Sequence, residues 1–299
     1  MSVLPDVVAL GETMLSLVAL DAPLGSSTTL HVTHGGAESN ACVALVRLGL
    51  RAAWVSRLGR DPAGDRVLAE LERAGVDLRW VRRDPDRPTG LMLRDTLGTV
   101  RYYRSGSAAS ALAPADLEGV PVEQARAVLV TGITAMLGGD PGRAAISLFE
   151  RATGIRALDP NVRPGLWGSD RAAELIGPLV ARCDVLLGGE SELRVFAGDL
   201  DGVELARACS ALGPREVVVR RGGRGAGALL ADGRWIDCAP PPAPDIDPVG
   251  AGDAFNAGYL AAKLDGAEPE DVLERAATLG AIAASTRGDT GALRTSDEP

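Results

Sequence analysis

The segment Asp247–Gly258 reads Asp-Pro-Val-Gly-Ala-Gly-Asp-Ala-Phe-Asn-Ala-Gly. Gly250 and Gly252 allow the backbone to turn tightly and to come close to a ligand. The apolar residues after Asp253 predict a helix, whose first amide groups and dipole favour a bound anion. A carboxylate beside a bound anion makes chemical sense if it accepts a proton from a hydroxyl group that attacks a phosphoryl group. The segment therefore indicates a small-molecule kinase.

A dinucleotide-binding turn is the alternative interpretation of these glycines. That fingerprint needs a third glycine, but Phe255 stands at its position. The fingerprint also belongs to the first strand–helix–strand unit of a fold, whereas this segment lies near residue 250. We therefore predict that Asp253 is the catalytic base and that Gly250, Ala251 and Gly252 hold the transferred phosphoryl group.

The composition argues against several classes of protein. The chain has 299 residues, a net charge of −9 and 46% hydrophobic residues, which is enough for a sizeable core. The negative charge argues against a nucleic-acid partner. No apolar run is long enough to cross a bilayer, and residues 1–6 carry no secretion signal. We expect a single cytoplasmic domain over residues 1–299 with no membrane partner.

Cysteine and lysine usage narrows the chemistry further. Cys42, Cys183, Cys209 and Cys238 are far apart and lack the spacing of a zinc site, so we predict reduced and mostly buried thiols. Lys263 is the only lysine, and no Gly-x-x-x-x-Gly precedes it. A Walker-type phosphate loop and a protein-kinase lysine are therefore excluded, and Schiff-base chemistry is disfavoured.

Short apolar runs alternate with amphipathic helical patterns along the chain. Asp61-Pro62, Asp140-Pro141 and Ser169-Asp170 are typical helix starts. This alternation predicts an α/β fold with a mostly parallel sheet, helices on both of its faces, and ligands at the carboxyl ends of the strands. The expected strands are 6–10, 52–56, 127–131, 155–158, 184–187 and 216–220, and the expected helices include 38–48, 62–74, 141–153 and 170–181.

Two regions break this alternation. Residues 13–33 and about 87–106 alternate polar and apolar residues and contain turn signals such as Leu97-Gly98. Both are too short to form a core of their own. We predict that they form a small β-lid over the ligand edge of the sheet, and that a second copy of the chain pairs with this lid to give a homo-oligomer.

The segment from His34 to Asn40 is a second candidate for the ligand site. Gly35 and Gly36 allow close approach before a helix, and Asn40 offers an amide. A simple helix cap by Ser39 or Asn40 explains the same residues equally well. His34 could be proposed as a base, but a histidine beside a loop is more often incidental.

Arginines mark three further segments. Arg101-Tyr102-Tyr103-Arg104 in the lid could bind a carboxylate or phosphate, or could be an edge strand with solvated arginines. Asp159-Pro-Asn161-Val-Arg163 directly follows a predicted strand, so it is either part of the ligand edge or a surface turn. Arg220 to Gly227 is either a hairpin or a loop that follows phosphates.

In their order along the chain, these segments resemble the ribokinase family of sugar kinases, also called the PfkB family. The resemblance runs nearly end to end and is most specific at Asp247–Asp253. Within the family the chain is most similar to the 2-keto-3-deoxygluconate kinases. The segments that carry this similarity are Gly11-Glu12, Gly35-Gly36-Ala37-Glu38, Thr89-Gly90-Leu91, Tyr102 to Pro114, Thr131-Gly132-Ile133-Thr134 and Arg287-Gly288-Asp289.

The resemblance implies a ribokinase-like three-layer α/β/α fold with a β-lid. It also implies ATP-dependent phosphorylation, with Mg²⁺, of the 6-hydroxyl of a sugar acid. The implied substrate-binding residues are Gly35, Gly36, Asn40, Met92, Tyr102, Tyr103, Arg104, Ile133, Arg163, Asp253 and Asp289. The implied nucleotide-binding residues are Asn161, Arg163, Arg220, Gly222, Gly223, Gly225, Gly250, Ala251 and Gly252. Glu192 would contact the metal through water.

Three positions depart from the family pattern. Gly189 stands for an asparagine near the metal, Met92 for a lid tyrosine, and Ala277 for an asparagine near the nucleotide. Two other functions stay open beside the sugar-acid kinase. One is a kinase of a neutral sugar or nucleoside such as fructose, ribose or adenosine, which Arg104 disfavours. The other is a sugar-binding sensor without catalysis, which the intact Asp253 disfavours.

Overall fold

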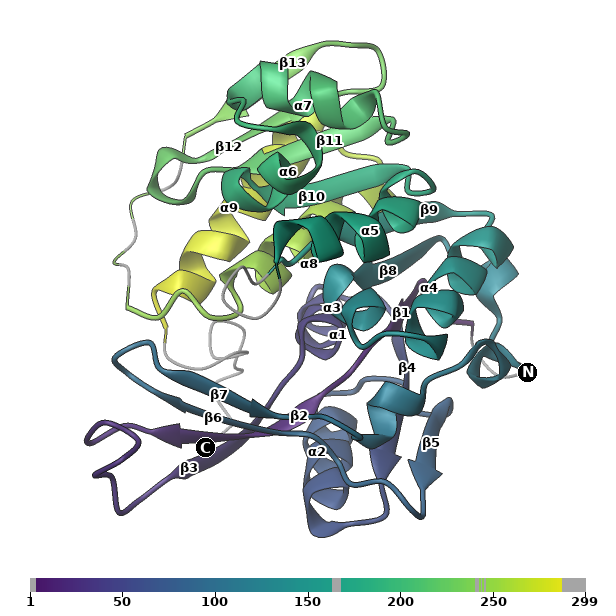
Figure 1. Ribbon diagram of the computed structural model, residues 1–299. Helices are drawn as coiled ribbons and strands as arrows, with labels where there is room; N and C mark the ends of the chain where they lie inside the picture. The colour runs from purple at the N-terminus through teal and green to yellow at the C-terminus, as the bar shows by residue number, and fades with distance from the viewer. Residues whose placement is uncertain (1–3, 163–167, 240–241, 243, 245, 287–299) are drawn as a thin grey trace.

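The apolar runs of the sequence form the central strands of a nine-stranded sheet in the computed structural model, which describes residues 4–162, 168–239, 242, 244 and 246–286. The strand order is β13-β12-β11-β10-β9-β8-β1-β4-β5 (Figure 1). Neighbouring strands from β5 to β11 are parallel, and β12 and β13 extend the sheet in antiparallel fashion. The bounds are β1 (Val7–Leu10), β4 (Ala52–Gly59), β5 (Val81–Asp84), β8 (Ala127–Thr131), β9 (Ile155–Asp159), β10 (Val185–Gly189), β11 (Glu216–Arg220), β12 (Ala226–Leu229) and β13 (Trp235–Cys238).

Helices cover both faces of this sheet, which explains why its strands are apolar at consecutive positions. Val8 and Leu10 of β1 face one helical layer, and Val7 and Ala9 face the other. The first layer holds α3 (Gly132–Met136), α4 (Asp140–Arg151), α5 (Ser169–Val180), α6 (Glu190–Ala197) and α7 (Gly202–Ser210). The second holds α1 (Ala37–Arg47), α2 (Pro62–Arg73), α8 (Ala251–Leu264) and α9 (Pro269–Ala284).

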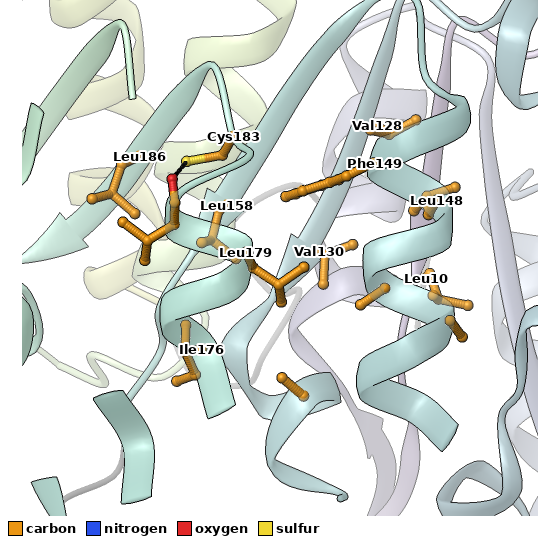
Figure 2. Close-up of a cluster of buried hydrophobic side chains, with 14 of the residues drawn as sticks. Leu10, Val128, Val130, Leu148, Phe149, Leu158, Ile176, Leu179, Cys183 and Leu186 are labelled. Carbon is orange, nitrogen blue, oxygen red and sulfur yellow. Dashed lines mark hydrogen bonds between the residues drawn. The ribbon is translucent and has the colours of Figure 1, made fainter. Parts of the chain in front are cut away.

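Figure 2 shows part of the first core. Phe149 of α4 and Leu179 of α5 pack against Val130 and Leu158, which come from adjacent strands. Burying one such side chain contributes about 1.5–3 kcal/mol to the free energy of unfolding. The two cores thus hold the strand ends rigidly, and these ends carry the polar residues described below.

The β-lid is a separate four-stranded sheet in the order β3-β2-β6-β7, drawn below the main sheet in Figure 1. Its strands are β2 (Met14–Ala19), β3 (His31–Gly35), β6 (Leu91–Asp95) and β7 (Val100–Tyr103). This second sheet lies at the two regions that break the helical alternation. Short 3-10 turns at Ala108–Ala111, Pro114–Leu117 and Val122–Gln124 lead the chain from the lid back to β8.

Most of the expected elements are confirmed within a few residues. The segment Arg220–Gly227 is a hairpin, because β11 and β12 pair in antiparallel fashion around a 3-10 turn at Gly222–Arg224. The sequence interpretation did not name strands β5, β12 and β13 or helices α3, α6, α7 and α9, although Pro269 at the start of α9 is a helix-start signal. No helix among the described residues is both long and apolar enough to cross a membrane.

The cysteines are free, as predicted. Cys42, Cys183 and Cys209 are buried, and Cys238 is half-buried. Burial raises the pKa of Cys209 to about 12, and it raises the pKa of Cys42 and Cys183 further. These thiols therefore behave as small apolar side chains of the core.

Candidate active site

A cavity of about 840 Å³ lies between the lid and the carboxyl ends of the central strands. The lid contributes Met14, Met92, Arg94, Val100, Tyr102 and Arg104 to its wall. The core contributes Asn40, Asp159, Glu192 and the residues from Pro248 to Asp253, and the hairpin contributes Gly222, Gly223 and Gly225. A cavity of this size is large enough for a nucleotide and a small sugar together.

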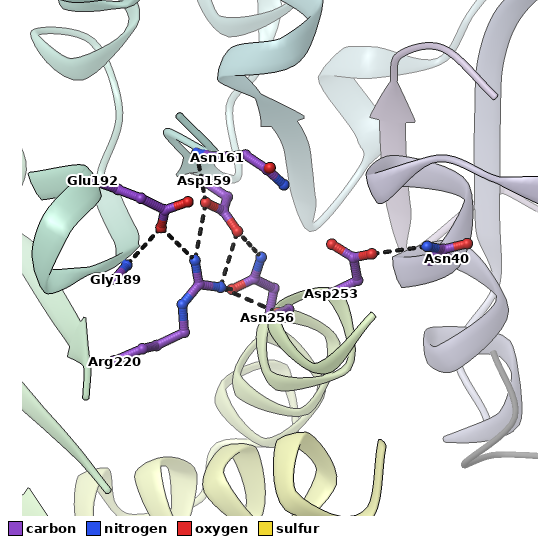
Figure 3. A network of polar contacts seen from close by, with 9 residues as sticks. Asn40, Asp159, Asn161, Gly189, Glu192, Arg220, Asp253 and Asn256 are labelled. Atoms are coloured by element: carbon purple, nitrogen blue, oxygen red, sulfur yellow. Dashed lines mark hydrogen bonds and ion pairs between the residues drawn. The ribbon is translucent and has the colours of Figure 1, made fainter. Parts of the chain in front are cut away.

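Asp253 lies in the first turn of α8, which begins at Ala251, two residues earlier than its sequence pattern suggested. Gly250 precedes the helix with φ 79°, a left-handed conformation that favours glycine. Asp253 is 9% exposed and lines the cavity. Its Oδ2 accepts a hydrogen bond of 2.8 Å from Asn40 Nδ2 (Figure 3). A candidate base, a bend and a helix N-terminus thus lie together.

Asn40 is presented by α1, whose start depends on Gly36. A Cβ atom at Gly36 would lie 2.3 Å from the Glu12 carbonyl oxygen, so no other residue fits this approach. Asn40 Oδ1 is buried and has no hydrogen-bond partner among the described residues. Because Asn40 Nδ2 is already bound to Asp253, this oxygen is left to accept a hydrogen bond from a ligand hydroxyl.

Arg220, at the end of β11, connects the end of β9 to the first turn of α6, the helix that follows β10 (Figure 3). Its guanidinium donates to both oxygens of Asp159, at 2.9 and 3.1 Å, and to Glu192 Oε2 at 3.1 Å. Nη1 also donates to the carbonyl oxygen of Gly252 at 3.2 Å and to Asn256 Oδ1 at 2.9 Å. Asn256 Nδ2 in turn donates to Asp159 Oδ2 at 2.7 Å. The network therefore fixes the start of α8 against the sheet.

Burial and charge oppose each other at this arginine. Burial alone would lower the pKa of Arg220, but the neighbouring carboxylates of Asp159 and Glu192 raise it well above its usual range. The guanidinium is thus permanently charged, and its donors are used by protein groups. Arg220 lines the cavity, yet these contacts assign it to holding the site together and leave little of it for the predicted contact with the nucleotide.

Glu38 connects α1 to the start of α3, and residues of both helices line the cavity. Its Oε1 accepts hydrogen bonds from the Thr131 backbone amide at 2.9 Å and from the Thr131 and Thr134 hydroxyls at 2.8 Å. Complete burial raises the pKa of the Glu38 carboxyl, although these donors act in the opposite direction. The contacts hold α3 against α1, and Ile133 of α3 lines the cavity between them.

Arg104 reaches the cavity from the end of β7. Its Nη2 forms an ion pair with Glu12 Oε2, and Glu12 Oε1 accepts a hydrogen bond of 2.6 Å from Ser107. Arg104 Nε is buried without a hydrogen-bond partner among the residues that the structure describes. Glu12 therefore fixes the position of the guanidinium, while at least one donor is still available for an anionic ligand.

The structure brings most of the predicted site residues to this one cavity. Those that line it are Gly35, Gly36, Asn40, Met92, Tyr102, Arg104, Ile133, Asn161, Glu192, Arg220, Gly222, Gly223, Gly225, Gly250, Ala251, Gly252 and Asp253. Ala277, which replaces a family asparagine, also lines it. Arg163 and Asp289 lie outside the described residues.

Two residues of the sequence interpretation lie elsewhere. Tyr103 is 61% exposed and absent from the lining, because side chains alternate along β7 and its neighbour Tyr102 occupies the inner face. The structure therefore does not support a direct contact of Tyr103 with a ligand in this cavity. His34 is buried against α2, where Nδ1 lies 2.7 Å from Glu70 Oε2, so it is not a catalytic base.

Sequence reasoning missed Asn256, Glu12 and Arg94. Asn256 follows Asp253 by three residues, which is the spacing of one helix face, and this signal could have been used. Arg94 follows Met92 by two residues and so shares its face of β6. Asp247, the ion-pair partner of Arg94, is 153 residues away, and no pattern in the sequence links the two residues.

Comparison with known proteins gives consistent matches. The family model described as pfkB family carbohydrate kinase matches residues 4–296. The 2-dehydro-3-deoxygluconokinase of Thermoproteus tenax is 33% identical over 96% of this chain and 91% of its own length. That of Bacillus subtilis (strain 168) is 32% identical over 98% and 94%. The crystal structure of a PfkB protein from Polaromonas sp. JS666 superposes with a TM-score of 0.84 at 34% identity, covering 93% of this chain and 94% of that one.

Proposed function

Because this chain belongs to the PfkB family of carbohydrate kinases and uses ATP, we propose that it phosphorylates the 6-hydroxyl of a sugar acid, 2-dehydro-3-deoxy-D-gluconate. One observation carries the proposal. The Asp253 carboxylate, the N-terminus of α8 and Arg104 of the lid line the same cavity. The first two groups supply the phosphoryl-transfer chemistry, and the arginine supplies a contact for an acid.

The residues divide this chemistry between them. Asp253 accepts the proton of the attacking hydroxyl, which as general-base catalysis contributes roughly 10²–10⁴-fold. Asn40 orients the carboxylate through its 2.8 Å hydrogen bond. The amides from Gly250 to Asp253 face the charge that develops on the phosphoryl group, where loss of one donor typically costs about 10²–10³-fold. The lid excludes water that would otherwise hydrolyse ATP.

The hairpin end of the cavity suits the nucleotide. Gly222, Gly223 and Gly225 line it without side chains, and Ala277 and Gly280 of α9 line the same cavity. We expect a nucleotide bound beside these residues to direct its phosphates toward the start of α8, which lines the same cavity. We expect the terminal phosphoryl group to lie between the nucleotide end and Asp253.

The residues at this end also fit Mg²⁺ held through water. Asn161 Oδ1 is buried without a hydrogen-bond partner in the described part of the chain, and Glu192 lines the same wall. Among the described residues no cluster of histidine, cysteine and acidic side chains could hold a metal directly. Mg²⁺ keeps several waters and binds phosphates readily, so Asn161 and Glu192 would accept hydrogen bonds from its waters. When bound, the metal neutralises charge on the phosphates.

The acid specificity rests on Arg104. We expect Arg104→Gln to raise KM for 2-dehydro-3-deoxy-D-gluconate by roughly ten- to a hundredfold, because a hydrogen bond to a charged group contributes about 1.5–3 kcal/mol. KM for ATP should change little. Steady-state kinetics of both substrates measures the effect. Arg101→Gln, which removes an exposed arginine from the preceding strand β7, is the control and should leave both values unchanged. If Arg104→Gln and the wild type had equal KM values for the sugar acid, Arg104 would not be the residue that contacts its carboxylate.

A coupled ADP-release assay tests the proposed substrate. The panel contains 2-dehydro-3-deoxygluconate, its galactonate epimer at C4, fructose, ribose and adenosine. We expect the highest kcat/KM with a keto-deoxy sugar acid. A preference for a neutral sugar or nucleoside would show that the chain is a kinase of that compound and not of a sugar acid. If none of these compounds led to ADP release, a sugar-binding sensor would be favoured.

We also propose that the chain forms a homo-oligomer through the outer face of the lid. The strand register puts Leu17, Val32, Leu91, Leu93 and Tyr103 on the face opposite Met92 and Tyr102. These side chains are half-buried or exposed in the single chain. The lid has apolar side chains on both faces, and the rest of the chain that the structure describes does not fully cover its outer face. The outer face of a second copy is equally apolar and could cover it.

The oligomer can be tested by sedimentation velocity. We expect Leu93→Arg to convert the wild-type assembly to monomers, because it buries a charge in the proposed interface. Leu212→Arg, at another exposed leucine, is the control and should leave the assembly intact. A monomeric wild type would refute this interface.

A further inference from the structure

An ion pair joins the lid to the segment that forms the anion site. Arg94 of β6 lines the cavity and is 6% exposed. Its Nη1 lies 3.3 Å from Oδ2 of Asp247, 153 residues further along the chain. Asp247 opens the Asp247–Asp253 segment, so a lid residue contacts the start of the phosphoryl-transfer loop.

The second oxygen of Asp247 shapes the loop itself. Oδ1 accepts a hydrogen bond of 3.2 Å from the Val249 backbone amide, at the turn that leads into the left-handed Gly250. The backbone amides of Ile246 and Asp247 both donate to the Ala284 carbonyl oxygen, at 2.8 and 3.0 Å. The backbone before the turn is thus held by α9, and the carboxylate of Asp247 connects the turn to Arg94.

The same lid strand also faces the proposed sugar end of the cavity. Met92 and Arg94 lie two residues apart on β6, opposite Tyr102 and Val100 of β7, and all four line the cavity. A ligand that contacts this face therefore contacts the strand that carries Arg94. A shift of β6 changes the distance between Arg94 and Asp247, and with it the turn before Gly250.

We infer that Arg94 is a positioning residue that couples occupancy of the sugar site to the shape of the anion site at Gly250–Gly252. The inference rests on the proposed function, because it requires sugar and phosphoryl donor to share this cavity. A sugar bound against β6 holds Arg94 at Asp247, and this contact keeps the loop in the conformation that binds phosphate. Without sugar the loop is less well ordered for phosphate, which limits hydrolysis of ATP by water.

Coupling of this kind is measurable as a change in nucleotide affinity. Calorimetry gives Kd for a non-hydrolysable ATP analogue with and without a saturating sugar. In the wild type we expect the sugar to tighten nucleotide binding by roughly 5- to 150-fold, the usual range of coupling between two sites. In Arg94→Met we expect the two Kd values to agree within about twofold, by the same definition of coupling.

A second variant and a control pair separate coupling from a structural role. Asp247→Asn retains an acceptor for the Val249 amide but loses the charge, and it should lose the coupling as Arg94→Met does. Combining both changes should add nothing further, since each removes the same contact. Arg234→Met and Glu270→Gln remove an exposed pair with the same 3.3 Å separation and should leave the coupling intact.

The outcome does not depend on which sugar the enzyme prefers. The sugar used is the one that the wild type phosphorylates in the ADP-release assay, so a neutral substrate would refute the proposed acid but still test the coupling. Equal coupling in the wild type and Arg94→Met would overturn the inference, as would a wild type whose nucleotide affinity is insensitive to sugar. Should Arg94→Met fail to fold, Asp247→Asn alone decides between these results.

Discussion

We expect Asp253→Asn to lower kcat for sugar phosphorylation by roughly 10²–10⁴-fold, the usual contribution of a general base. Asparagine has the same shape as aspartate and can still accept the hydrogen bond from Asn40 Nδ2 that positions this side chain. It cannot accept the proton of the attacking hydroxyl. The substitution therefore removes the proton transfer and leaves the backbone amides of α8 in place.

The measurement combines kcat with a binding constant. Kd for ATP, from calorimetry, should change less than threefold or so, because the amides and the glycine-lined end of the cavity are untouched. Asp265→Asn, at the exposed opposite end of the same helix, is the matched control and should behave as the wild type. Turnover of Asp253→Asn close to that of the wild type would assign the base to another residue.

Replacing Arg220 by methionine should have the second large effect, in this case on stability. Methionine retains the length of the side chain but leaves the carboxylates of Asp159 and Glu192 without their shared counter-ion. Asp159 is 1% exposed, so its charge stays poorly solvated. Breaking a buried ion pair from one side costs about 3–5 kcal/mol. The start of α8 also loses the hydrogen bond to Gly252, so kcat should fall as well.

Thermal unfolding measures this change. We expect the Tm to fall by about 10 °C, since 1 kcal/mol corresponds to about 2–4 °C in a chain of this size class. Arg224→Met is the control from the same hairpin. Its guanidinium is 70% exposed and pairs with Glu190 at the surface, so we expect a change within about 1 kcal/mol. If both variants unfolded at the same temperature, the network around Arg220 would not hold the site together.

The sequence predicted the parts of the site that depend on local patterns. Gly250 is needed for its backbone conformation, and the apolar run after it forms a helix, so this loop could be recognised without a structure. The carboxyl-end positions of Asp159 and Arg220 also follow from the strand pattern. Their contact does not, because it requires β9, β10 and β11 to be neighbours in the sheet.

Long-range pairing explains what the sequence did not predict. Tyr102 and Tyr103 are neighbouring residues of the same type, so the sequence does not distinguish them. Only the register of β7 on β6 decides which of the two faces the cavity. Arg94 and Asp247 are separated by 153 residues, and no local pattern connects them. Arg220 was expected to bind the nucleotide because an arginine beside glycines suits phosphate. Its carboxylate partners come from distant parts of the sequence, Asp159 from β9 and Glu192 from α6.

The most direct test is a crystal structure with 2-dehydro-3-deoxy-D-gluconate and a non-hydrolysable ATP analogue bound together. The account predicts an Asp253 carboxylate oxygen within hydrogen-bond reach, about 2.6–3.2 Å, of the sugar 6-hydroxyl. It also predicts that the terminal phosphate lies against the amides from Gly250 to Asp253. A sugar bound with its 6-hydroxyl away from Asp253, or a phosphate remote from the start of α8, would contradict it.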